Sequence, residues 1–477
     1  MLGSYPRQPA AQGLGATFAL LLVAGGVGVG TAAFGPLAML PIIGGVLVAL
    51  VVTRPEYGIA LFLSTFLMTY PKALQGSGFL TPNNVLGGLF LLLLTYKLYR
   101  EEDWWFLRSR EIQLLAFISL TYYLSGRLNA PDATQMSLLG LGAGQAETLR
   151  TFLGRVAFVV FFINFIRTPE HVRMVFVLAL AFMVVSAFTG MQGALTGGGI
   201  YGGRAAGALG VIQAAYNPNR LAMFSILAMA GLWYLMQWLR VPGVRVFIIP
   251  TLIGLALTVL LTASRSGLLG LAVAVAAIVI DQRARISTLV NFVFAGVVLV
   301  VFMLPFVPAR TLERITNLPG TEAAEVGEGA GSLERREYTM GLAFELVRES
   351  PFLGVGLGNW DVARFLKDPA RSTAAPHSSY LLALVEGGVF CLLGFVGLLW
   401  CTWRNLREVE AYVVDPAFPL RDLSWIVKSC KVSFIVLVFF SLFADLWQMV
   451  ILFWLVGLGV VMRRLVEQAA LQEALAA

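Results

Sequence analysis

The stretch VFIIPTLIGLALTVLLTASRSGLLGLAVAVAAIVI, residues 246–280, decides the fold. Apolar residues fill both of its halves, and a short polar turn, TASRS at 262–266, separates them. Each half approaches the length of about 20 apolar residues that a membrane-spanning helix requires. Neither half alternates apolar and polar residues with the period of two that a membrane barrel strand shows. The stretch therefore predicts two transmembrane helices joined by a turn that carries Arg265.

The same pattern extends over the rest of the chain. Of its 477 residues, 58% are hydrophobic and only 13% are charged, whereas soluble domains are about 25% charged. We therefore expect an all-α, polytopic integral membrane protein with about 14 transmembrane helices and one long periplasmic loop. The approximate spans are 14–33, 36–53, 57–70, 83–98, 111–126, 150–166, 172–194, 218–239, 245–262, 266–281, 287–306, 379–403, 426–445 and 447–463.

The distribution of Lys and Arg predicts the orientation of these spans. Basic connections occur at 53–58, 96–111, 166–173, 239–245, 281–287, 403–410 and 463–468. An even number of spans places them on one side with both termini. That side is cytoplasmic by the positive-inside rule. The net charge of +7 is therefore a topology signal, and it does not indicate nucleic-acid binding.

This topology divides the chain into three parts. Residues 1–306 hold helices 1–11 with a cytoplasmic N-terminus, and 379–477 hold helices 12–14 with a cytoplasmic tail. Between them, 307–378 form the long periplasmic loop. An apolar stripe from Tyr338 to Val347 predicts a short amphipathic helix in this loop, lying on the outer membrane surface and ending before Pro351.

Three arginines, Arg204, Arg220 and Arg265, fall on the face opposite the basic connections, near span ends. Such a side chain can snorkel to lipid headgroups, which is the alternative for any one of them. Together, beside a glycine-rich loop, they favour an anion site, because a guanidinium grips phosphate through two hydrogen bonds. Ser264 and Ser266 add hydroxyl groups, and a helix that begins near them would add N–H donors. The expected ligand is a phosphate in the membrane, such as a lipid-linked pyrophosphate.

His377 lies where the long outer loop re-enters the membrane, and it can exchange a proton near neutral pH. The sequence contains no Asp-x-Asp, no metal-ligand spacing and no phosphate-binding loop of the G-x-x-x-x-G-K type, so we expect no metal and no cofactor. The cysteines, Cys391, Cys401 and Cys430, lie in or at the ends of apolar runs without a C-x-x-C motif. They predict no disulfide framework.

Four stretches, in this order, resemble the O-antigen ligase and Wzy-type polymerase superfamily of bacterial envelope glycosyltransferases. GRAAGALGVIQAAYNPNRLAMF at 203–224 is similar to an Arg-x-x-Gly segment followed by Asn-Pro-Asn, and LTASRSGLLGL at 261–271 is similar to a Ser-Arg turn. AFELVRESPFLGVGLGNW at 343–360 is similar to the family's outer-loop signature, and PHSSYLLALVEGGVFCLLGF at 376–395 to its re-entry helix. Ser378 stands where the family usually has asparagine.

The resemblance implies a multi-pass protein of the bacterial inner membrane with a periplasmic active site. It would transfer an undecaprenyl-pyrophosphate-linked glycan to a sugar hydroxyl, with inversion and without a metal. The acceptor would be lipid A-core for a ligase, or another lipid-linked glycan for a polymerase of O-antigen or exopolysaccharide.

Residue roles follow from the same resemblance. His377 would be the general base, and Arg265 would stabilise the departing pyrophosphate. The expected substrate-binding residues are Arg204, Asn217, Asn219, Arg220, Ser264, Asn359 and Glu386, of which Glu386 would orient His377. The alternative from another class is a flippase or transporter of the same lipid-linked oligosaccharide. A structural scaffold would leave the arginines and the long loop unexplained.

Overall fold

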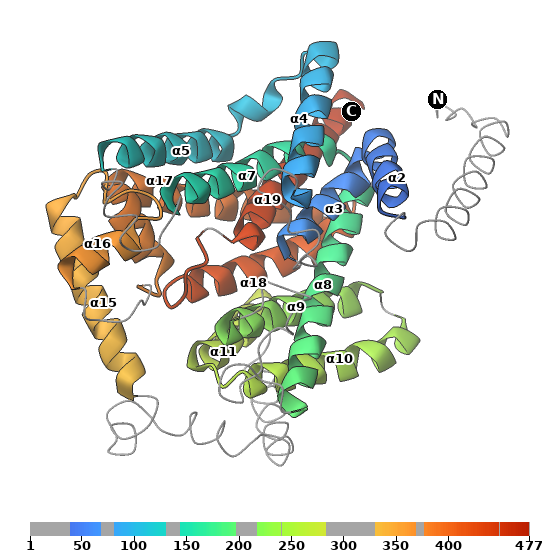
Figure 1. Cartoon of the computed structure of the whole chain (residues 1–477). Coiled ribbons are helices and arrows are strands. Elements are labelled where there is room, and N and C mark those ends of the chain that lie inside the picture. The colour runs from blue at the N-terminus through green and yellow to red at the C-terminus, as the bar shows by residue number, and fades with distance from the viewer. Residues whose placement is uncertain are drawn as a thin grey trace. The chain divides into compact units, whose positions relative to one another are not determined.

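The computed structural model describes residues 39–67, 81–129, 144–196, 217–239, 241–282, 330–368, 376–447 and 449–476 (Figure 1). Within these ranges the chain forms fourteen α-helices and two short 3-10 helices, and it has no β-strand. The predicted all-helical fold class is confirmed. The chain divides into two compact units, Met1–Ile59 and Ala60–Ala477.

The first unit contains α2 (Met39–Thr53) and the start of α3 (Pro55–Leu67). The second unit contains the rest of α3 and all later elements. These are α4 (Pro82–Glu101), η3 (Trp105–Arg108), α5 (Arg110–Leu128), α7 (Gly144–Phe165), α8 (Pro169–Leu195), α9 (Pro218–Leu239), α10 (Pro242–Leu261), α11 (Arg265–Asp281), α15 (Ala330–Glu349), α16 (Trp360–Lys367), α17 (Ser379–Val413), η6 (Arg421–Leu423), α18 (Ser424–Phe440) and α19 (Val450–Ala476).

Proline marks the first residue of several described helices. It has no N–H group and its φ suits a helix, so the first turn accepts it without loss. Threonine caps two of these starts: the Thr81 hydroxyl accepts the N–H of Asn84 at 3.4 Å, and the Thr168 hydroxyl accepts that of His171 at 3.3 Å. The helices that start this way are α3, α4, α8, α9 and α10. Their starts can therefore be predicted from the sequence.

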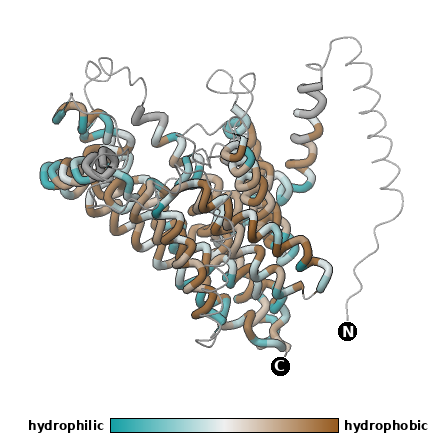
Figure 2. The backbone as a smooth tube through the Cα atoms, turned by 90° about the horizontal axis from the view of Figure 1, so that it is seen from below, coloured by the Kyte–Doolittle hydropathy of each residue, from teal (hydrophilic) through white to brown (hydrophobic). Residues whose placement is uncertain are grey.

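Twelve of the fourteen predicted spans coincide with described helices, and the spans 14–33 and 287–306 lie outside the described residues. Six of the described helical segments are long and apolar enough to cross a membrane, by length and composition. They are Thr148–Phe165, Pro169–Leu195, Pro218–Leu239, Pro242–Leu261, Ser379–Val413 and Arg421–Phe440. Figure 2 shows hydrophobic residues along much of the length of the packed helices. The total of about 14 spans stays a prediction.

Two helices organise the packing of the second unit. Helix α9 packs against α8, α10, α11 and α18, and α17 packs against α5, α18 and α19. Glycines allow close approach, as is common between membrane helices. A Cβ at Gly394 of α17 would lie 2.6 Å from Ile118 Cγ1 of α5, and one at Gly231 of α9 would lie 2.8 Å from Leu180 Cδ1 of α8. Larger residues at these positions would push the helices apart.

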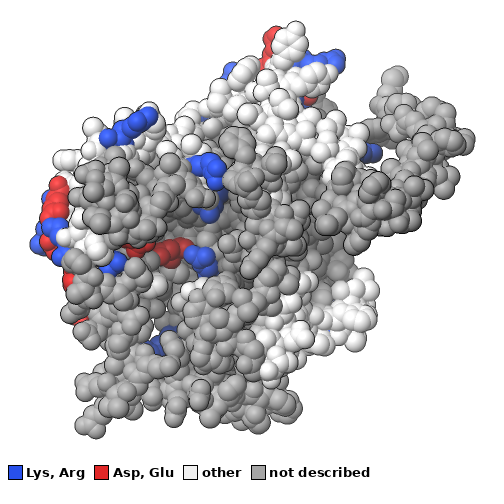
Figure 3. Space-filling view, viewed as in Figure 1, with Lys and Arg blue, Asp and Glu red and all other residues white. Residues whose placement is uncertain are grey.

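One end of the second unit gathers several of the basic connections that the sequence predicts to be cytoplasmic. Asp103 pairs with Arg464 at 3.0 Å and with Arg167 at 3.4 Å, which joins three connections far apart in the sequence. Lys431 of α18 pairs with Asp281, the last residue of α11, at 3.1 Å. In Figure 3 charged side chains also appear at the top of the view, where α4 ends. The structure brings these residues together, and the side of the membrane stays a prediction.

Helices α15 and α16 lie in the segment before α17, and Figure 1 shows them beside its start. Leu342, Leu346 and Trp360 form one apolar cluster with Leu381 of α17. Lys367 of α16 forms ion pairs with two glutamates of α15, Glu345 and Glu349. Helix α15 covers the stripe from Tyr338 to Val347, whereas the sequence does not predict α16. The position of α15 and α16 outside the membrane stays a prediction.

Candidate functional site

The turn between α10 and α11 carries Arg265. Ala263 has a φ of 48°, which turns the chain sharply before the new helix. Ser264 caps α11, because its Oγ accepts the N–H of Gly267 at 2.9 Å. Arg265 is the first helical residue, half-buried, and the side chain of Ser266 lies 3.0 Å from Ser264 Oγ. A polar turn at the end of two apolar helices is thus held by its own serine.

The start of α9 is bound to this turn. Asn217 Oδ1 accepts the N–H of Asn219 at 2.8 Å, so the Asn-Pro-Asn sequence forms a tight turn of its own. Ser264 Oγ donates to Asn219 Oδ1, also at 2.8 Å. A Cβ at Gly267 would lie 2.8 Å from Ala222 Cβ, which shows how closely α11 approaches α9. The structure therefore brings three predicted site residues, Asn217, Asn219 and Ser264, into one turn-to-turn contact.

Arg220 joins this contact to the connection between α18 and α19. One guanidinium nitrogen of Arg220 donates to the carbonyl oxygen of Asp445 at 3.3 Å. Burial raises the pKa of the Asp445 carboxyl group to about 6, although the neighbouring Arg220 charge lowers it. An acidic residue and an arginine thus lie near each other at the site, and the acid has a reduced preference for its charged form.

The same connection holds the start of α17, and with it His377. Ser379 donates its N–H to Ser441 O at 2.8 Å and its hydroxyl to Ala444 O at 2.8 Å. The hydroxyl also accepts the N–H of Leu446 at 2.8 Å. The N–H of Trp447 donates to the same hydroxyl at 3.1 Å, so His377 lies two residues before a serine held by four hydrogen bonds. Its own φ is 49°, which is uncommon for residues other than glycine, although asparagine, aspartate and histidine adopt it more often than the rest.

Ser378 has a defined role at this position. Its side chain accepts the N–H of Leu381 at 3.4 Å and caps α17. Serine and asparagine are both good N-cap residues. The departure from the family's asparagine therefore leaves the cap in place and removes only the amide group.

The glycine-rich loop 351–359 docks on a break in α17. Gly388 has φ 67° and ψ −169°, which interrupts the helix. The freed backbone groups pair with the loop: Val389 N donates to Pro351 O at 2.8 Å, and Val355 N donates to Val385 O at 2.8 Å. Gly354, also at positive φ, lies so close that a Cβ there would be 2.4 Å from Val385 O. The loop and the helix break therefore form one unit.

Asn359 and Glu386 both belong to this unit. Asn359 is buried, and its amide donates to Val355 O at 2.8 Å and to Asn129 O of the α5 end at 3.2 Å. The N–H groups of Gly358 and Trp360 lie against the carboxyl group of Glu386. These contacts hold the loop, and the predicted contacts of both residues with substrate stay predictions.

Glu386 and His377 lie nine residues apart, in and just before a regular stretch of α17. At 1.5 Å per residue this spacing is about 13 Å along the helix axis. Glu386 also interacts electrostatically with Asp445 of the α18–α19 connection. The printed contacts of Glu386 are with the loop, and its predicted role in orienting His377 stays a prediction.

Two residues that the sequence analysis missed lie at the site. Asp445 is the first. The second is Arg155 of α7, whose charge repels that of Arg220. Both fall inside or at the end of an apolar run, and an ionisable residue in such a run is by default a functional candidate. The position of each residue in an apolar run could have identified it as a candidate. Nothing in the sequence shows that either residue lies near Arg220.

All of the predicted site residues except one lie within the described residues. Arg204 lies outside the described residues. In the described ranges no group of three or more His, Cys, Asp or Glu side chains is arranged to hold a metal ion. What the arrangement offers is an arginine-rich end of a helical bundle with one histidine and one buried aspartate beside it. Such a set can bind an anion and move one proton.

Residues 250–396 match the family model Wzy_C, the O-antigen ligase family. The matched segment runs from α10 into α17, so it includes Arg265, the glycine-rich loop and His377. The resemblance to the O-antigen ligase and Wzy superfamily is confirmed there. No curated protein sequence matches the chain. Together with its apolar helices, the match identifies a multi-pass membrane protein and supports a function of the O-antigen ligase or polymerase type in general.

Proposed function

We propose that the protein is a membrane glycosyltransferase of the O-antigen ligase or polymerase type. It transfers a glycan from undecaprenyl pyrophosphate to an acceptor sugar at the periplasmic face of the inner membrane. The observation that carries the proposal is the hydrogen-bonded junction of three segments: the α9 start, the α10–α11 turn and the α18–α19 connection. This junction places Arg220 and Arg265 at the end of the bundle where Ser379 fixes the start of α17 beside His377.

Electrostatics explain why this junction suits a pyrophosphate. Arg155 and Arg220 repel each other, and the nearby turn adds Arg265. Several guanidinium groups gathered at the end of apolar helices attract an anion. A pyrophosphate carries several negative oxygens, and guanidinium groups bind them in a planar, two-bond geometry. The lipid tail of the donor would remain in the membrane beside the helices.

The reaction is a direct displacement at the anomeric carbon. The acceptor hydroxyl oxygen bonds to that carbon, the bond to the phosphate oxygen breaks, and the configuration inverts. His377 takes the proton of the hydroxyl as general base. Arg265, with Arg204 and Arg220, stabilises the negative charge that develops on the departing undecaprenyl pyrophosphate. In this mechanism the arginines supply the charge stabilisation for which other glycosyltransferases use a metal, so the transfer needs none.

Asp445 contributes to the proposed site through its contact with Arg220. Its carbonyl oxygen accepts from Arg220, and its carboxyl group lies close enough to be affected by the same charge. We assign its carbonyl oxygen the role of anchoring Arg220 to the connection that also holds Ser379, and its carboxyl group the role of stabilising the Arg220 charge. Both a ligase and a polymerase could use this site. The acceptor, lipid A-core or a lipid-linked glycan, distinguishes them.

Transfer by the purified protein tests the proposal. Protein in lipid vesicles is given a lipid-linked donor and a candidate acceptor, and the product is measured by mass spectrometry. Transfer should persist in excess EDTA. His377→Ala should reduce the rate by about a hundredfold to ten-thousandfold while donor binding survives. Arg265→Lys should reduce it by about a hundredfold to a thousandfold, because lysine keeps the charge but lacks the planar fork.

Matched controls separate these effects from general damage. His171→Ala changes the other histidine, which lies at the start of α8 in a predicted cytoplasmic connection, and Arg348→Lys changes an exposed arginine of α15. Both should transfer at nearly the wild-type rate. A folded Arg265→Lys protein with normal transfer would make that residue a snorkelling side chain. Movement of the donor across the vesicle membrane without any transfer would favour a flippase instead.

A further inference from the structure

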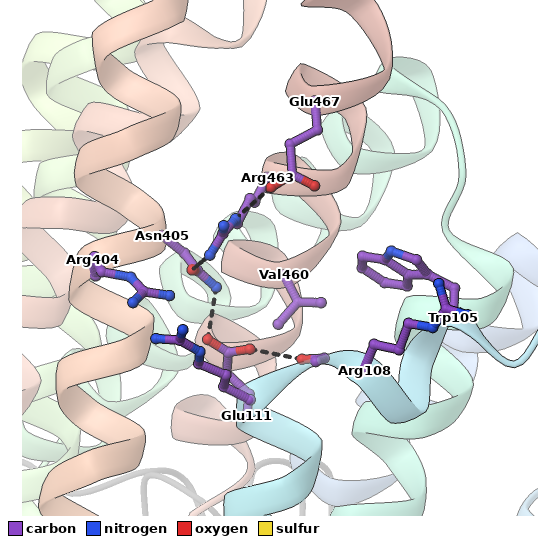
Figure 4. Close-up of a pocket in the computed structure, with 10 residues that line it drawn as sticks. Trp105, Arg108, Glu111, Arg404, Asn405, Val460, Arg463 and Glu467 are labelled. Carbon is purple, nitrogen blue, oxygen red and sulfur yellow. Dashed lines mark hydrogen bonds and ion pairs between the residues drawn. The ribbon is translucent and has the colours of Figure 1, made fainter. Parts of the chain in front are cut away.

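A second polar site lies at the opposite end of α17, about 40 Å along the helix from His377. It is a pocket of about 180 Å³ where α17, α19 and the η3–α5 segment meet. Its charged lining residues are Arg108, Arg110, Arg404, Arg463, Glu111 and Glu467. Figure 4 shows Arg404 and Asn405 coming from one helix, Arg463 from a second and Glu111 from a third.

Buried polar contacts fix the interior of this pocket. Glu111 is buried, and its two carboxylate oxygens accept from Ser109 Oγ at 2.7 Å and from Asn405 Nδ2 at 2.8 Å. Asn405 is also buried, and its Oδ1 accepts from Arg463 at 3.0 Å. A continuous series of bonds therefore runs from α5 through α17 to α19. It holds Arg463 in one place before any ligand arrives.

The lining carries more positive than negative charge. Arg463 pairs with Glu467 at 2.7 Å, and Arg404 pairs with Glu408 at 3.2 Å. Arg108 and Arg110 are exposed and form no ion pair with any described residue. The pocket also lies at the N-terminal end of α5, where the helix dipole is positive. These features favour an anion, and guanidinium groups favour phosphate among anions.

An apolar surface leads along one exposed face of α17 to this pocket. Leu393, Val396 and Trp400 are 62%, 47% and 66% exposed. Their spacing of three and four residues places them on one helix face, and Arg404 follows four residues later on the same face. The neighbouring Gly397 faces Leu114 of α5, with a Cβ position 3.4 Å from Leu114 Cδ2. The surface therefore runs along the contact between α17 and α5.

We propose that this site binds an anionic phospholipid. Its phosphate lies in the arginine pocket, in contact with Arg110 and Arg404, and one acyl chain lies along Leu393, Val396 and Trp400. A free phosphate would use the pocket but not the apolar surface that continues from it. A zwitterionic lipid would bring a cationic amine toward several arginines. The inference stands on this end of the bundle and is independent of the proposed transfer reaction.

Lipid titration of the full-length protein in a neutral detergent tests the inference. The probes are phosphatidylglycerol, phosphatidylcholine and inorganic phosphate, and the readouts are the apparent melting temperature and bound lipid by native mass spectrometry. Phosphatidylglycerol should stabilise the protein saturably, and phosphatidylcholine should not. Arg110→Gln removes an arginine without an ion pair among the described residues. It should weaken the apparent affinity about tenfold.

Two further variants sharpen the result. Arg407→Gln removes the same charge from α17 outside the pocket and should leave lipid binding unchanged. Trp400→Ala should weaken binding of phosphatidylglycerol without changing the effect of inorganic phosphate. Equal binding of both lipids, or unchanged affinity in Arg110→Gln, would overturn the inference. Stabilisation by inorganic phosphate alone, with no further effect of the lipid, would overturn it as well.

Discussion

Two adjacent serines determine where His377 lies. Ser378 caps α17, and Ser379 binds the α18–α19 connection through both its N–H and its hydroxyl. The histidine before them has left-handed backbone angles, so it depends on these bonds to stay in place. Asp445 lies in the same connection, and its raised pKa makes the stability of the protein depend on pH.

Asp445→Asn tests the electrostatic account at this residue. Burial outweighs the attraction of Arg220 and raises the carboxyl pKa from 3.8 to about 6. A raised pKa means that the folded protein binds this proton more tightly than the unfolded chain. The resulting stability is therefore fully present below pH 3.8 and is lost as the pH rises through about 6. Above that pH the charged carboxyl group costs the folded protein at most about 3 kcal/mol.

The variant has no charge to bury at any pH. Its melting temperature in detergent should equal or exceed that of the wild type at pH 7.5, and the gain should shrink as the pH falls to 5. Transfer should slow about tenfold, because Arg220 loses the charge beside it. Asp361→Asn, an exposed aspartate of α16, is the control for both measurements. A large loss of stability at pH 7.5 would show that Asp445 forms a stabilising ion pair instead.

The break in α17 is the element on which the outer loop depends. Below the break, Glu386 O accepts from Gly356 N at 3.0 Å, and above it Val389 N donates to Pro351 O. Ser125 of α5 donates to Leu353 O and, at 3.2 Å, to Glu386 O, so a third element closes the contact. An unbroken helix would keep these backbone groups for itself.

Gly388→Ala should disrupt the break in α17 and the docking of the loop on it. The glycine has φ 67° and ψ −169°, a region that is nearly exclusive to glycine, and an added Cβ would lie 2.1 Å from Phe352 O. The strain alone costs about 1–3 kcal/mol. We expect a lower melting temperature and faster proteolysis within 351–359. Gly341→Ala in α15, where a Cβ would meet nothing within 4 Å, should be neutral or slightly stabilising. Equal melting temperatures of Gly388→Ala and wild type would contradict the account.

At the scale of the whole molecule, the sequence predicts the features that depend on neighbouring residues, namely the apolar helices and the short motifs. Apolar run lengths predict about fourteen spans because each run must cross a fixed thickness, and twelve of them coincide with described helices. The order of the motifs leads to Arg265 and His377. Helix α16 is missed, since its eight residues are too few for a periodic pattern to stand out. The break at Gly388 is missed because a glycine in an apolar run is also compatible with a continuous helix.

The remaining features depend on contacts between distant residues. Arg220 and Asp445 are 225 positions apart, and Asn405 and Glu111 are 294 apart. Hydrophobic periodicity describes which face of a helix is apolar, but it does not say which helix lies against that face. The junction at the candidate site and the arginine pocket could therefore be found only from the structure.

Topology is the prediction that concerns the whole molecule. The contacts place the basic connections at one end of the bundle and Arg265 with His377 at the other, and the positive-inside rule makes the first end cytoplasmic. The native cysteines, Cys391, Cys401 and Cys430, are all buried, so an introduced cysteine should react without background. Arg348→Cys adds one on the exposed side of α15, and Gln468→Cys adds one on the exposed side of α19.

An impermeant thiol reagent should label Arg348→Cys while the inner membrane is intact. It should label Gln468→Cys only after that membrane is broken. The reverse pattern would place the arginine-rich junction in the cytoplasm, where a donor on the periplasmic leaflet could not reach it. It would then also place the phospholipid pocket in the outer leaflet. The two sites lie at opposite ends of α17, so one labelling experiment fixes the side of both.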